Sequence, residues 1–455
     1  MEKKLVFQEV QDLEALCQEV SRFIWSHPEL GGNEKKSANY IRQCLNDEGF
    51  KIVNNDKIEH AFYAEYGTGK PVIGILGEYD ALPGLSQMVS TEVAPITEGG
   101  PGHGCSHNLI ASSCVTATVA LKHIMEKEHI SGTIRFYGCP EEELLCGKTK
   151  MIKLGMFDEC DVALSWHPNF SNKVHENNFL ANAGVKFHFT GKSSHAGAAP
   201  ERGRSALDAV ELLSVGCNYL REHIIDKARV HYSTDCYGCP PNIVPPKASA
   251  WYYVRAPRMT DVREIMERLF DVARGAALMT GTQVEIEVQN GCSELTSSKE
   301  FADLVYKNML ETDIPGYTEE EKAFIKKLQP TLNQGLLANQ KKLFDEPESG
   351  IHLKVGARDI ESKLSMTASS DVGDVSKIIP TGFFTAATWP FGCVAHAWQV
   401  TAVSGSSIGE KGALYAAKVM VGTAYDLLTK PEELNKVVEA FGKTKDTFYE
   451  PMVTI

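Results

Sequence analysis

The sequence predicts a protein of the α/β class, in which a larger mixed-sheet domain carries an inserted α+β domain. Three observations support this. The chain has 455 residues, which is long for a single hydrophobic core. In its first part, short and almost wholly apolar strands alternate with helices, as in a sheet covered on both faces. Residues 184–292 instead show the order β-α-β-β-α-β of a ferredoxin-like split unit.

The elements of the first part follow from hydrophobic periodicity and from breakers. Apolar residues at helical spacing predict helices over 9–27 and 34–48, which end at His27-Pro28 and at Gly49. Apolar runs predict strands at 62–66, 71–76, 132–137 and 162–165, with a helix over 108–127. Ligands in such sheets bind beyond the carboxyl ends of the strands. Residues that carry chemistry follow these strands, so we expect a site there.

The inserted domain is expected to contain two helices and four strands. The strands are predicted at 185–190, 228–235, 247–255 and 283–288, and the helices at 203–223 and 260–279. A sheet of this kind has a free edge, which dimerisation commonly closes. We therefore expect a larger domain over 1–183 and 293–455, with a polar peripheral insertion at about 310–365 and a final helix at 411–428, and a lid or dimerisation domain over 184–292.

Composition argues against several classes of partner. The net charge is −13, from 46 basic and 59 acidic residues, and no long basic block could follow a phosphate backbone. We expect neither nucleic acid nor membrane as a partner. The N-terminus lacks the apolar stretch of a secretory signal, and no run approaches the ~18–20 apolar residues of a membrane span. These observations favour a cytoplasmic protein.

Twelve cysteines at irregular spacings favour reduced thiols over a disulfide framework. The pair Cys236-x-x-Cys239 could bind zinc or act in redox chemistry. However, the second half of a four-cysteine site is missing and Pro240-Pro241 follows, so two free thiols in a loop are the better interpretation.

Four segments carry side chains that suit a metal ion. Cys105 and His107 stand two apart in a glycine-flanked loop before a helix, and three glutamates follow the strand at 132–137. His167 follows another strand, and His396 precedes Trp398. Each has a structural alternative taken alone, such as a solvated acidic loop or a hydrogen-bonded histidine, and Cys105 could instead be a nucleophile. Together they predict a site for two divalent metal ions, Mn²⁺ or Zn²⁺.

Longer stretches of sequence resemble a known family. The segments Gly102–Asn108, Gly138–Glu143, Trp166–Pro168 and Ser194–Gly197 are similar to those of the dinuclear metallopeptidases that include aminoacylases and plant auxin-conjugate amidohydrolases. The similarity extends from about residue 10 to 430. It implies Cys105 as a bridging ligand, His107 and His167 on one metal, Glu143 and His396 on the other, Glu142 as general base, and Asp80 as a carboxylate that orients a ligand.

The resemblance also implies roles for the inserted domain. His195 would reach across a dimer and stabilise the oxyanion in the partner's site, while Asn242 and Arg255 would bind the substrate's carboxylate. The expected assembly is a homodimer, with a heterodimer of paralogous subunits as the alternative. A non-catalytic partner subunit is a further alternative, but neither a ligand nor Glu142 is missing.

The implied reaction is hydrolysis of the amide bond of an N-acyl or N-aroyl amino acid by a metal-activated water. Substrates of the p-aminobenzoyl-glutamate type are expected, and auxin-type aryl-acetyl conjugates and dipeptides are the alternatives. An acidic amino acid would need a further cation, for which Lys192, Arg202 and Arg204 are candidates.

The sequence departs from the family in two places. Ser106-His107-Asn108 replaces the Gly-His-Asp of much of the family, and Glu141 stands where the branch most similar to this chain commonly has a small residue. We expect the Glu141 carboxylate either to raise the pKa of a neighbour or to face solvent.

Overall fold

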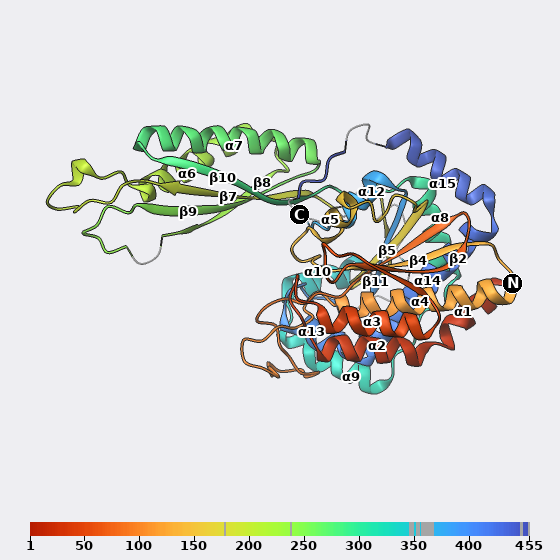
Figure 1. Cartoon of the computed structure of the whole chain (residues 1–455). Coiled ribbons are helices and arrows are strands. Elements are labelled where there is room, and N and C mark those ends of the chain that lie inside the picture. The colour runs from red at the N-terminus through yellow and green to blue at the C-terminus, as the bar shows by residue number, and fades with distance from the viewer. Residues whose placement is uncertain are drawn as a thin grey trace. The chain divides into compact units, whose positions relative to one another are not determined.

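The computed structural model describes residues 1–176, 179–236, 239–344, 350–351, 355, 368–445 and 449–453. The chain forms two compact units, whose elements are labelled in Figure 1. Unit 1 comprises Met1–Asn177, Thr296–Ser365 and Val375–Tyr449, and unit 2 comprises Asn178–Leu295, Met366–Asp374 and Glu450–Ile455.

Unit 1 is built on a seven-stranded mixed sheet with the order β1-β2-β4-β3-β5-β11-β6. Its strands are β1 (Lys51–Asn54), β2 (Phe62–Thr68), β3 (Val72–Glu78), β4 (Gly132–Cys139), β5 (Val162–Asn169), β6 (Lys173–His175) and β11 (Thr381–Ala387). The four central strands β4, β3, β5 and β11 are parallel to one another. Their carboxyl ends therefore open on one edge of the sheet.

The helices of unit 1 are α1 (Lys3–Gln11), α2 (Glu14–Ser26), α3 (Lys35–Asp47), α4 (His107–Glu128), α5 (Gly147–Lys153), α8 (Lys299–Glu311), α9 (Glu319–Leu328), α10 (Gln334–Phe344), α13 (Trp398–Ser404), α14 (Ser407–Thr429) and α15 (Pro431–Thr444). A short helix, α12 (Val372–Ile378), spans residues of both units. Helices α4 and α14 pack against the central strands and against each other, and α1 and α2 contact that pair.

The central strands are buried on both faces, as their apolar sequences predict. Every residue of β3, β4 and β11 is buried, and α4 and α14 are themselves almost wholly buried. A single large apolar cluster joins these elements. The rigid core therefore fixes the positions at which the parallel strands end.

Unit 2 has the expected ferredoxin-like arrangement. Its antiparallel sheet has the order β10-β7-β9-β8, formed by β7 (Ala181–Thr190), β8 (Arg229–Asp235), β9 (Lys247–Ala256) and β10 (Gln283–Cys292). Helices α6 (Ala206–Leu220) and α7 (Met259–Thr280) pack against each other and against the sheet (Figure 1). Strand β8 is at an edge, and six of its seven residues are exposed.

Two expectations about helices were wrong. The helix predicted from residue 9 is two helices, α1 and α2, separated at Asp12-Leu13. The chain also forms α15 after the helix that was expected to be final; its amphipathic sequence buries Val437 and Ala440. Part of the predicted insertion at 310–365 forms α9 and α10, and 345–349, 352–354 and 356–367 lie outside the described residues.

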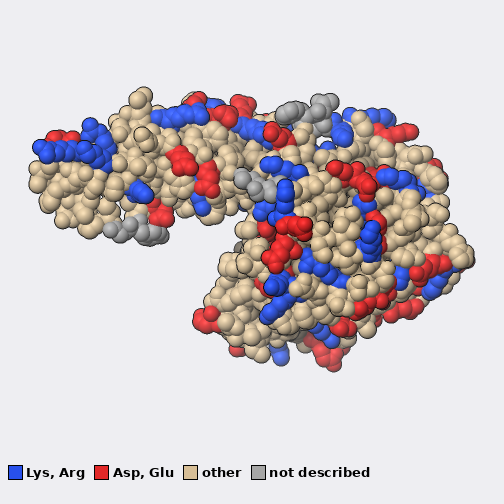
Figure 2. All heavy atoms as spheres, in the orientation of Figure 1, with Lys and Arg blue, Asp and Glu red and all other residues tan. Residues whose placement is uncertain are grey.

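Basic and acidic residues are interspersed on the face drawn in Figure 2, over both units. In the part of the chain that the structure describes, no helix is both long and apolar enough to span a membrane. All twelve cysteines are free thiols.

Candidate metal centre

The chemical residues of unit 1 gather at the carboxyl edge of its parallel strands. Asp80 follows β3, Glu142 and Glu143 follow β4, and His167 is near the end of β5. The loop between β11 and α13 carries His396. A backbone hydrogen bond of 2.9 Å from the His396 N–H to the Gly104 carbonyl joins this loop to the segment that carries Cys105.

The segment before α4 is shaped by close backbone packing. A Cβ atom at Gly102 would lie 1.9 Å from the carbonyl oxygen of Leu85, and one at Gly104 would lie 2.3 Å from the Leu85 side chain. Ser106 takes a left-handed conformation with φ 66°, which L residues seldom adopt. Its hydroxyl accepts a 2.9 Å hydrogen bond from the Trp389 indole, which helps to hold this turn.

Two sets of three side chains could each hold a metal ion, and they share Cys105. One set is Cys105, His107 and His167, and the other is Cys105, Glu143 and His396. Within each set the potential ligand atoms lie within 4.8 Å of one another. The Cys105 thiol is 3.3 Å from His167 Nε2, and Glu143 Oε2 is 3.5 Å from His396 Nε2. Sulfur, imidazole and carboxylate in this arrangement suit a dinuclear centre with a bridging thiolate.

Hydrogen bonds orient two of the imidazoles. His107 Nδ1 donates to Asp80 Oδ1 at 2.8 Å, and His167 Nδ1 donates to the Pro168 carbonyl at 2.8 Å. Each imidazole is thereby left with an Nε2 lone pair for the cluster. The second oxygen of Asp80 accepts the Glu143 backbone N–H at 2.8 Å, so one carboxylate fixes both a histidine and a glutamate of the cluster.

Buried polar atoms and buried acidic groups in the cluster would be stabilised by positive charge. His107 Nε2 and Glu143 Oε1 are buried and have no hydrogen-bond partner among the described residues. Burial raises the pKa of Glu143 to about 7 and raises the pKa of the Cys105 thiol. Burial also lowers the pKa of His167 to about 4, which keeps that imidazole neutral. Divalent cations would supply the missing charge and occupy the unpaired atoms.

Glu142 lies beside the two sets without belonging to either. Its Oε2 is 3.7 Å from His107 Nε2, at the same distance as Glu78 Oε2. Burial raises the pKa of Glu142 well above its ordinary value, and the neighbouring Glu78 carboxylate adds to this. Glu78, His107 and Glu142 form a third group of potential ligands.

Lys148 is a charged residue of this region that the sequence did not single out. Its Nζ lies 2.6 Å from Glu78 Oε1, and both side chains are buried. Because Lys148 comes from the short helix α5, no hydrophobic periodicity points to it. The one indication in the sequence that a cation would be needed here was the buried-strand glutamate Glu78, which ends β3 two residues before Asp80.

The two departures from the family pattern have structural explanations. Asn108 donates hydrogen bonds to the Ser21 hydroxyl and to the Ser404 carbonyl, so it stabilises the start of α4. The Glu141 carboxylate forms an ion pair with Lys150 and accepts a hydrogen bond from the Cys146 thiol. Of the two expectations for Glu141, the effect on a neighbour is confirmed, because its charge contributes to the raised pKa of Glu34. The carboxylate itself pairs with Lys150.

Unit 2 brings His195 and Asn242 together. The Ala196 N–H donates to the Asn242 carbonyl at 2.8 Å, and both His195 and Asn242 are exposed. His195 Nδ1 accepts hydrogen bonds from the Gly197 and Ala198 amides at 3.2 and 3.1 Å. A neutral imidazole held in this way carries its proton on Nε2, which is free to donate.

Arg255 lies at the other end of unit 2. It is near the end of β9, opposite Asn182, while Asn242 is in the loop before that strand. The strand from Lys247 to Arg255 spans roughly 26 Å at about 3.3 Å per residue. One copy of unit 2 therefore cannot place Asn242 and Arg255 on the same carboxylate.

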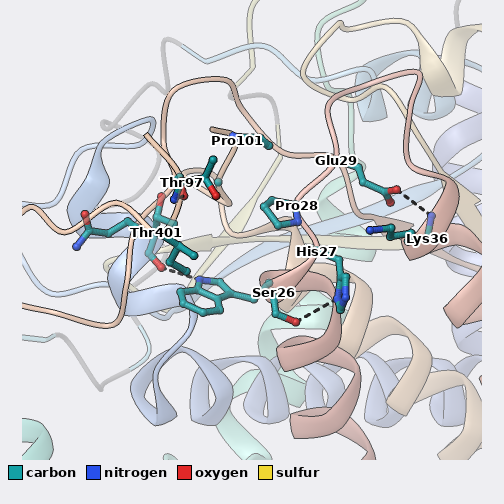
Figure 3. A pocket seen from close by; sticks show the side chains of 13 residues that line it. Ser26, His27, Pro28, Glu29, Lys36, Thr97, Pro101 and Thr401 are labelled. Atoms are coloured by element: carbon teal, nitrogen blue, oxygen red, sulfur yellow. Dashed lines mark hydrogen bonds between the residues drawn. The ribbon is translucent and has the colours of Figure 1, made fainter. Parts of the chain in front are cut away.

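A separate cavity of about 260 Å³ adjoins the metal-binding segment (Figure 3). It is lined by Trp25, His27, Glu29, Lys36 and Gly102, among others, and by none of the candidate ligands. The cavity therefore reaches the glycine loop at Gly102 but is separate from the cluster of candidate ligands.

Comparisons with known proteins agree with this geometry. Residues 181–278 match the peptidase dimerisation domain of the M20 family. Over 93% of this chain and 91% of the relative, the sequence is 38% identical to a subunit of the p-aminobenzoyl-glutamate hydrolase of Escherichia coli. The chain belongs to the M20 family. It is also 29% identical to a mouse Xaa-Arg dipeptidase, over 93% of this chain and 88% of that protein.

A solved M20 structure shares the fold. The dinuclear metal-binding peptidase from Bacillus subtilis is 17% identical and superposes with a TM-score of 0.60, over 92% of this chain and 99% of that one. Membership makes this M20 protein a hydrolytic enzyme that acts on amides. Its site groups side chains that could hold divalent metal ions.

Proposed function

We propose that this M20 enzyme hydrolyses the amide bond of N-acyl or N-aroyl amino acids, with substrates of the p-aminobenzoyl-glutamate type. The observation that carries the proposal is the pair of ligand sets that share Cys105, with the Glu142 carboxylate beside them. The sequence similarity to the E. coli p-aminobenzoyl-glutamate hydrolase supports the choice of substrate class.

In this proposal, Cys105 would be a ligand of both divalent cations, His107 and His167 would hold one, and Glu143 and His396 would hold the other. When bound, the cations act as Lewis acids on the attacking water and on the substrate carbonyl. A site that mixes thiolate, imidazole and carboxylate suits Zn²⁺ or Mn²⁺. Asp80 holds the His107 imidazole and the Glu143 backbone, and so keeps ligands from both cations in register.

Glu142 is proposed as the general base. Its carboxylate would take a proton from the attacking water and then deliver that proton to the leaving nitrogen. The water oxygen first bonds to the carbonyl carbon, and the carbon–nitrogen bond then breaks as the nitrogen takes up the proton. The products are a carboxylic acid and a free amino acid. No covalent bond to Cys105 is needed, because water is the nucleophile. Burial also raises the pKa of the Cys105 thiol, which disfavours the nucleophilic thiolate.

Unit 2 is proposed as the lid and dimerisation domain, in a homodimer. The free Nε2 proton of His195 would donate to the oxyanion in the partner's site. Asn242, beside His195, and Arg255, at the far end of β9, would bind the substrate's carboxylate groups. Because these two lie far apart on one chain, they would come from different copies. A heterodimer is the alternative assembly, since a second, different subunit of the E. coli hydrolase is also similar to part of this chain.

A dipeptidase activity is the second candidate, because the mouse Xaa-Arg dipeptidase covers most of both chains. Three exposed cations, Lys192, Arg202 and Arg204, lie on the same part of unit 2 as His195. Such charges favour an acidic amino acid and repel an arginine side chain.

We also propose a cytoplasmic location, because all twelve cysteines are free thiols.

The test is a panel of substrates with the purified protein and added Mn²⁺ or Zn²⁺. It should contain p-aminobenzoyl-glutamate, benzoyl- and acetyl-amino acids, indole-3-acetyl-aspartate and Xaa-Arg dipeptides. The proposal expects the highest kcat/KM for an aroyl-glutamate or aroyl-aspartate, loss of activity with EDTA and recovery on addition of metal. Turnover of Xaa-Arg dipeptides alone would favour the second candidate. Activity that survives EDTA but is lost on alkylation would point to a cysteine nucleophile.

A further inference from the structure

The backbone that presents Glu142 and Glu143 begins in an unfavourable conformation. Glu141 has φ 60°, in the left-handed region that glycine adopts readily and other residues seldom do. Such conformations persist only where surrounding contacts hold them, and they are common at functional sites. The contacts that hold Glu141 therefore bear on where the next two carboxylates point.

A buried glutamate from a distant part of the chain holds the Glu141 peptide. Glu34 Oε1 accepts the Glu141 N–H at 2.7 Å, and Glu34 is 0% exposed. On the other side of the base, Asp80 Oδ2 accepts the Glu143 N–H at 2.8 Å. Two carboxylates thus fix the backbone immediately before and immediately after Glu142.

Helix capping does not explain Glu34. It stands at the N-cap position of α3, but its side chain makes no capping hydrogen bond. Glu29 caps the helix instead: its carboxylate accepts the Lys36 amide at 3.0 Å (Figure 3). It also accepts the Ser37 amide at 2.9 Å.

Among the described residues, the Glu141 N–H is the one group distant in sequence that hydrogen-bonds the Glu34 carboxylate; the amide of Glu34 itself is the other donor. Its Oε2 is buried without a partner among the described residues. Burial, with the Asp80 charge adding to it, raises the pKa of Glu34 to about 8, so the side chain is a neutral acceptor near pH 7. A glutamine could serve in the same way.

We propose that Glu34 is a positioning residue of the metal centre, whose hydrogen bond from the Glu141 N–H holds the left-handed turn that aims Glu142 and Glu143. Gly31 lies against this turn, since a Cβ there would be 3.4 Å from the Glu141 Cα. The role rests on the proposed function only through the tasks given to Glu142 and Glu143.

The test compares E34A, E34Q and E29A with the wild-type protein. E34A removes the acceptor of the Glu141 N–H, and E34Q keeps it. E29A is the matched control, because the Glu29 carboxylate comes from the same loop but hydrogen-bonds only residues of α3. Titration calorimetry of the apo-protein with Mn²⁺ gives the affinity of each metal site without any substrate. Steady-state kinetics on the best substrate of the panel give kcat and KM, and thermal unfolding reports stability.

We expect E34A to weaken one of the two metal sites at least tenfold and to lower kcat at least tenfold, with KM within about twofold. E34Q should stay within about threefold of the wild type in both readouts, and E29A should lose thermal stability only. The proposal is overturned if E34A binds Mn²⁺ like E29A, or if E34Q is as impaired as E34A. If E34A does not fold, E34Q decides, since the proposal requires it to work. Should no substrate be hydrolysed, the calorimetry still tests the role of Glu34, separately from the proposed function.

Discussion

The two units of this enzyme hold their functional residues in opposite ways. In unit 1 the candidate ligands Cys105, His107 and Glu143 are largely buried and are fixed by neighbours such as Asp80 before any metal or substrate arrives. In unit 2 His195 and Asn242 are exposed on loops, and Arg255 lies at the far end of a ten-residue strand. In the proposed function, the first arrangement is preorganised for ions, and the second needs a partner copy to complete the site.

The difference follows from the physics of each task. A dinuclear centre needs several ligand atoms within a few ångströms, which only a rigid core can guarantee. A lid, the role proposed for unit 2, must open and close, so it carries few groups and leaves their donors free. His195 shows this well, because its Nδ1 is satisfied by two amides and its Nε2 is not.

The largest expected effect is at Glu142, on the preorganised side of the comparison. E142Q should lower kcat by about 10²–10⁴-fold, because the amide cannot accept the proton of the attacking water. Metal content, measured by elemental analysis, should remain that of the wild type. A variant that kept near-normal kcat would assign the base to another residue.

His195 tests the other side of the comparison. H195A should lower kcat by about 10²–10³-fold, as expected for loss of one oxyanion donor, and leave the metal-to-protein ratio unchanged. Mixing E142Q and H195A subunits should restore activity to about a quarter of the wild type, because half of the dimers are mixed and each has one intact site. No recovery after verified subunit exchange would place His195 in its own chain's site.

A smaller effect is expected at Asp80, which joins the ligands of both proposed ions. D80N replaces the carboxylate that fixes His107 and the Glu143 backbone, so metal affinity should fall about 10–100-fold. Calorimetry with Mn²⁺ measures this directly. Unchanged affinity would mean that the ligands are held by the core alone.

The last expected effect is on stability rather than on activity and concerns Glu34. The pKa of Glu34 is raised from 4.5 to about 8 in the folded state. Between these two pH values the native protein therefore holds a proton that the unfolded chain has released. The free energy of unfolding of the apo-protein should therefore fall relative to that of E34Q as pH rises from 5 to 8, by on the order of a few kcal/mol. Urea unfolding at several pH values measures the difference, and a gap that does not change with pH would contradict the raised pKa.

Much of this organisation could be predicted from local patterns. The apolar runs of β3 and β4 predicted the strands, and the polar residues that follow them, Asp80 and Glu142, indicated the edge where chemistry would occur. The β-α-β-β-α-β order predicted unit 2. Periodicity could not find the break between α1 and α2, where apolar residues continue at helical spacing through Leu13.

Other features could not be inferred because they are contacts between distant segments. Nothing in the sequence around Glu34 shows that it meets Glu141, and the pairing of Lys148 with Glu78 likewise depends on how α5 packs. The residue types at the strand ends also left open whether the Glu141 carboxylate would face solvent, whereas it pairs with Lys150.

The fold class, the two domain types and the residue types of a dinuclear site were all readable in the chain, because strand periodicity and the chemistry of thiol, imidazole and carboxylate are local properties. Folding in three dimensions was needed to bring two candidate ligand sets together at Cys105, which the resemblance had only implied, and to show that Asn242 and Arg255 are far apart on one chain. Distances between segments are set by how a core packs and how strands pair, and no single segment encodes them.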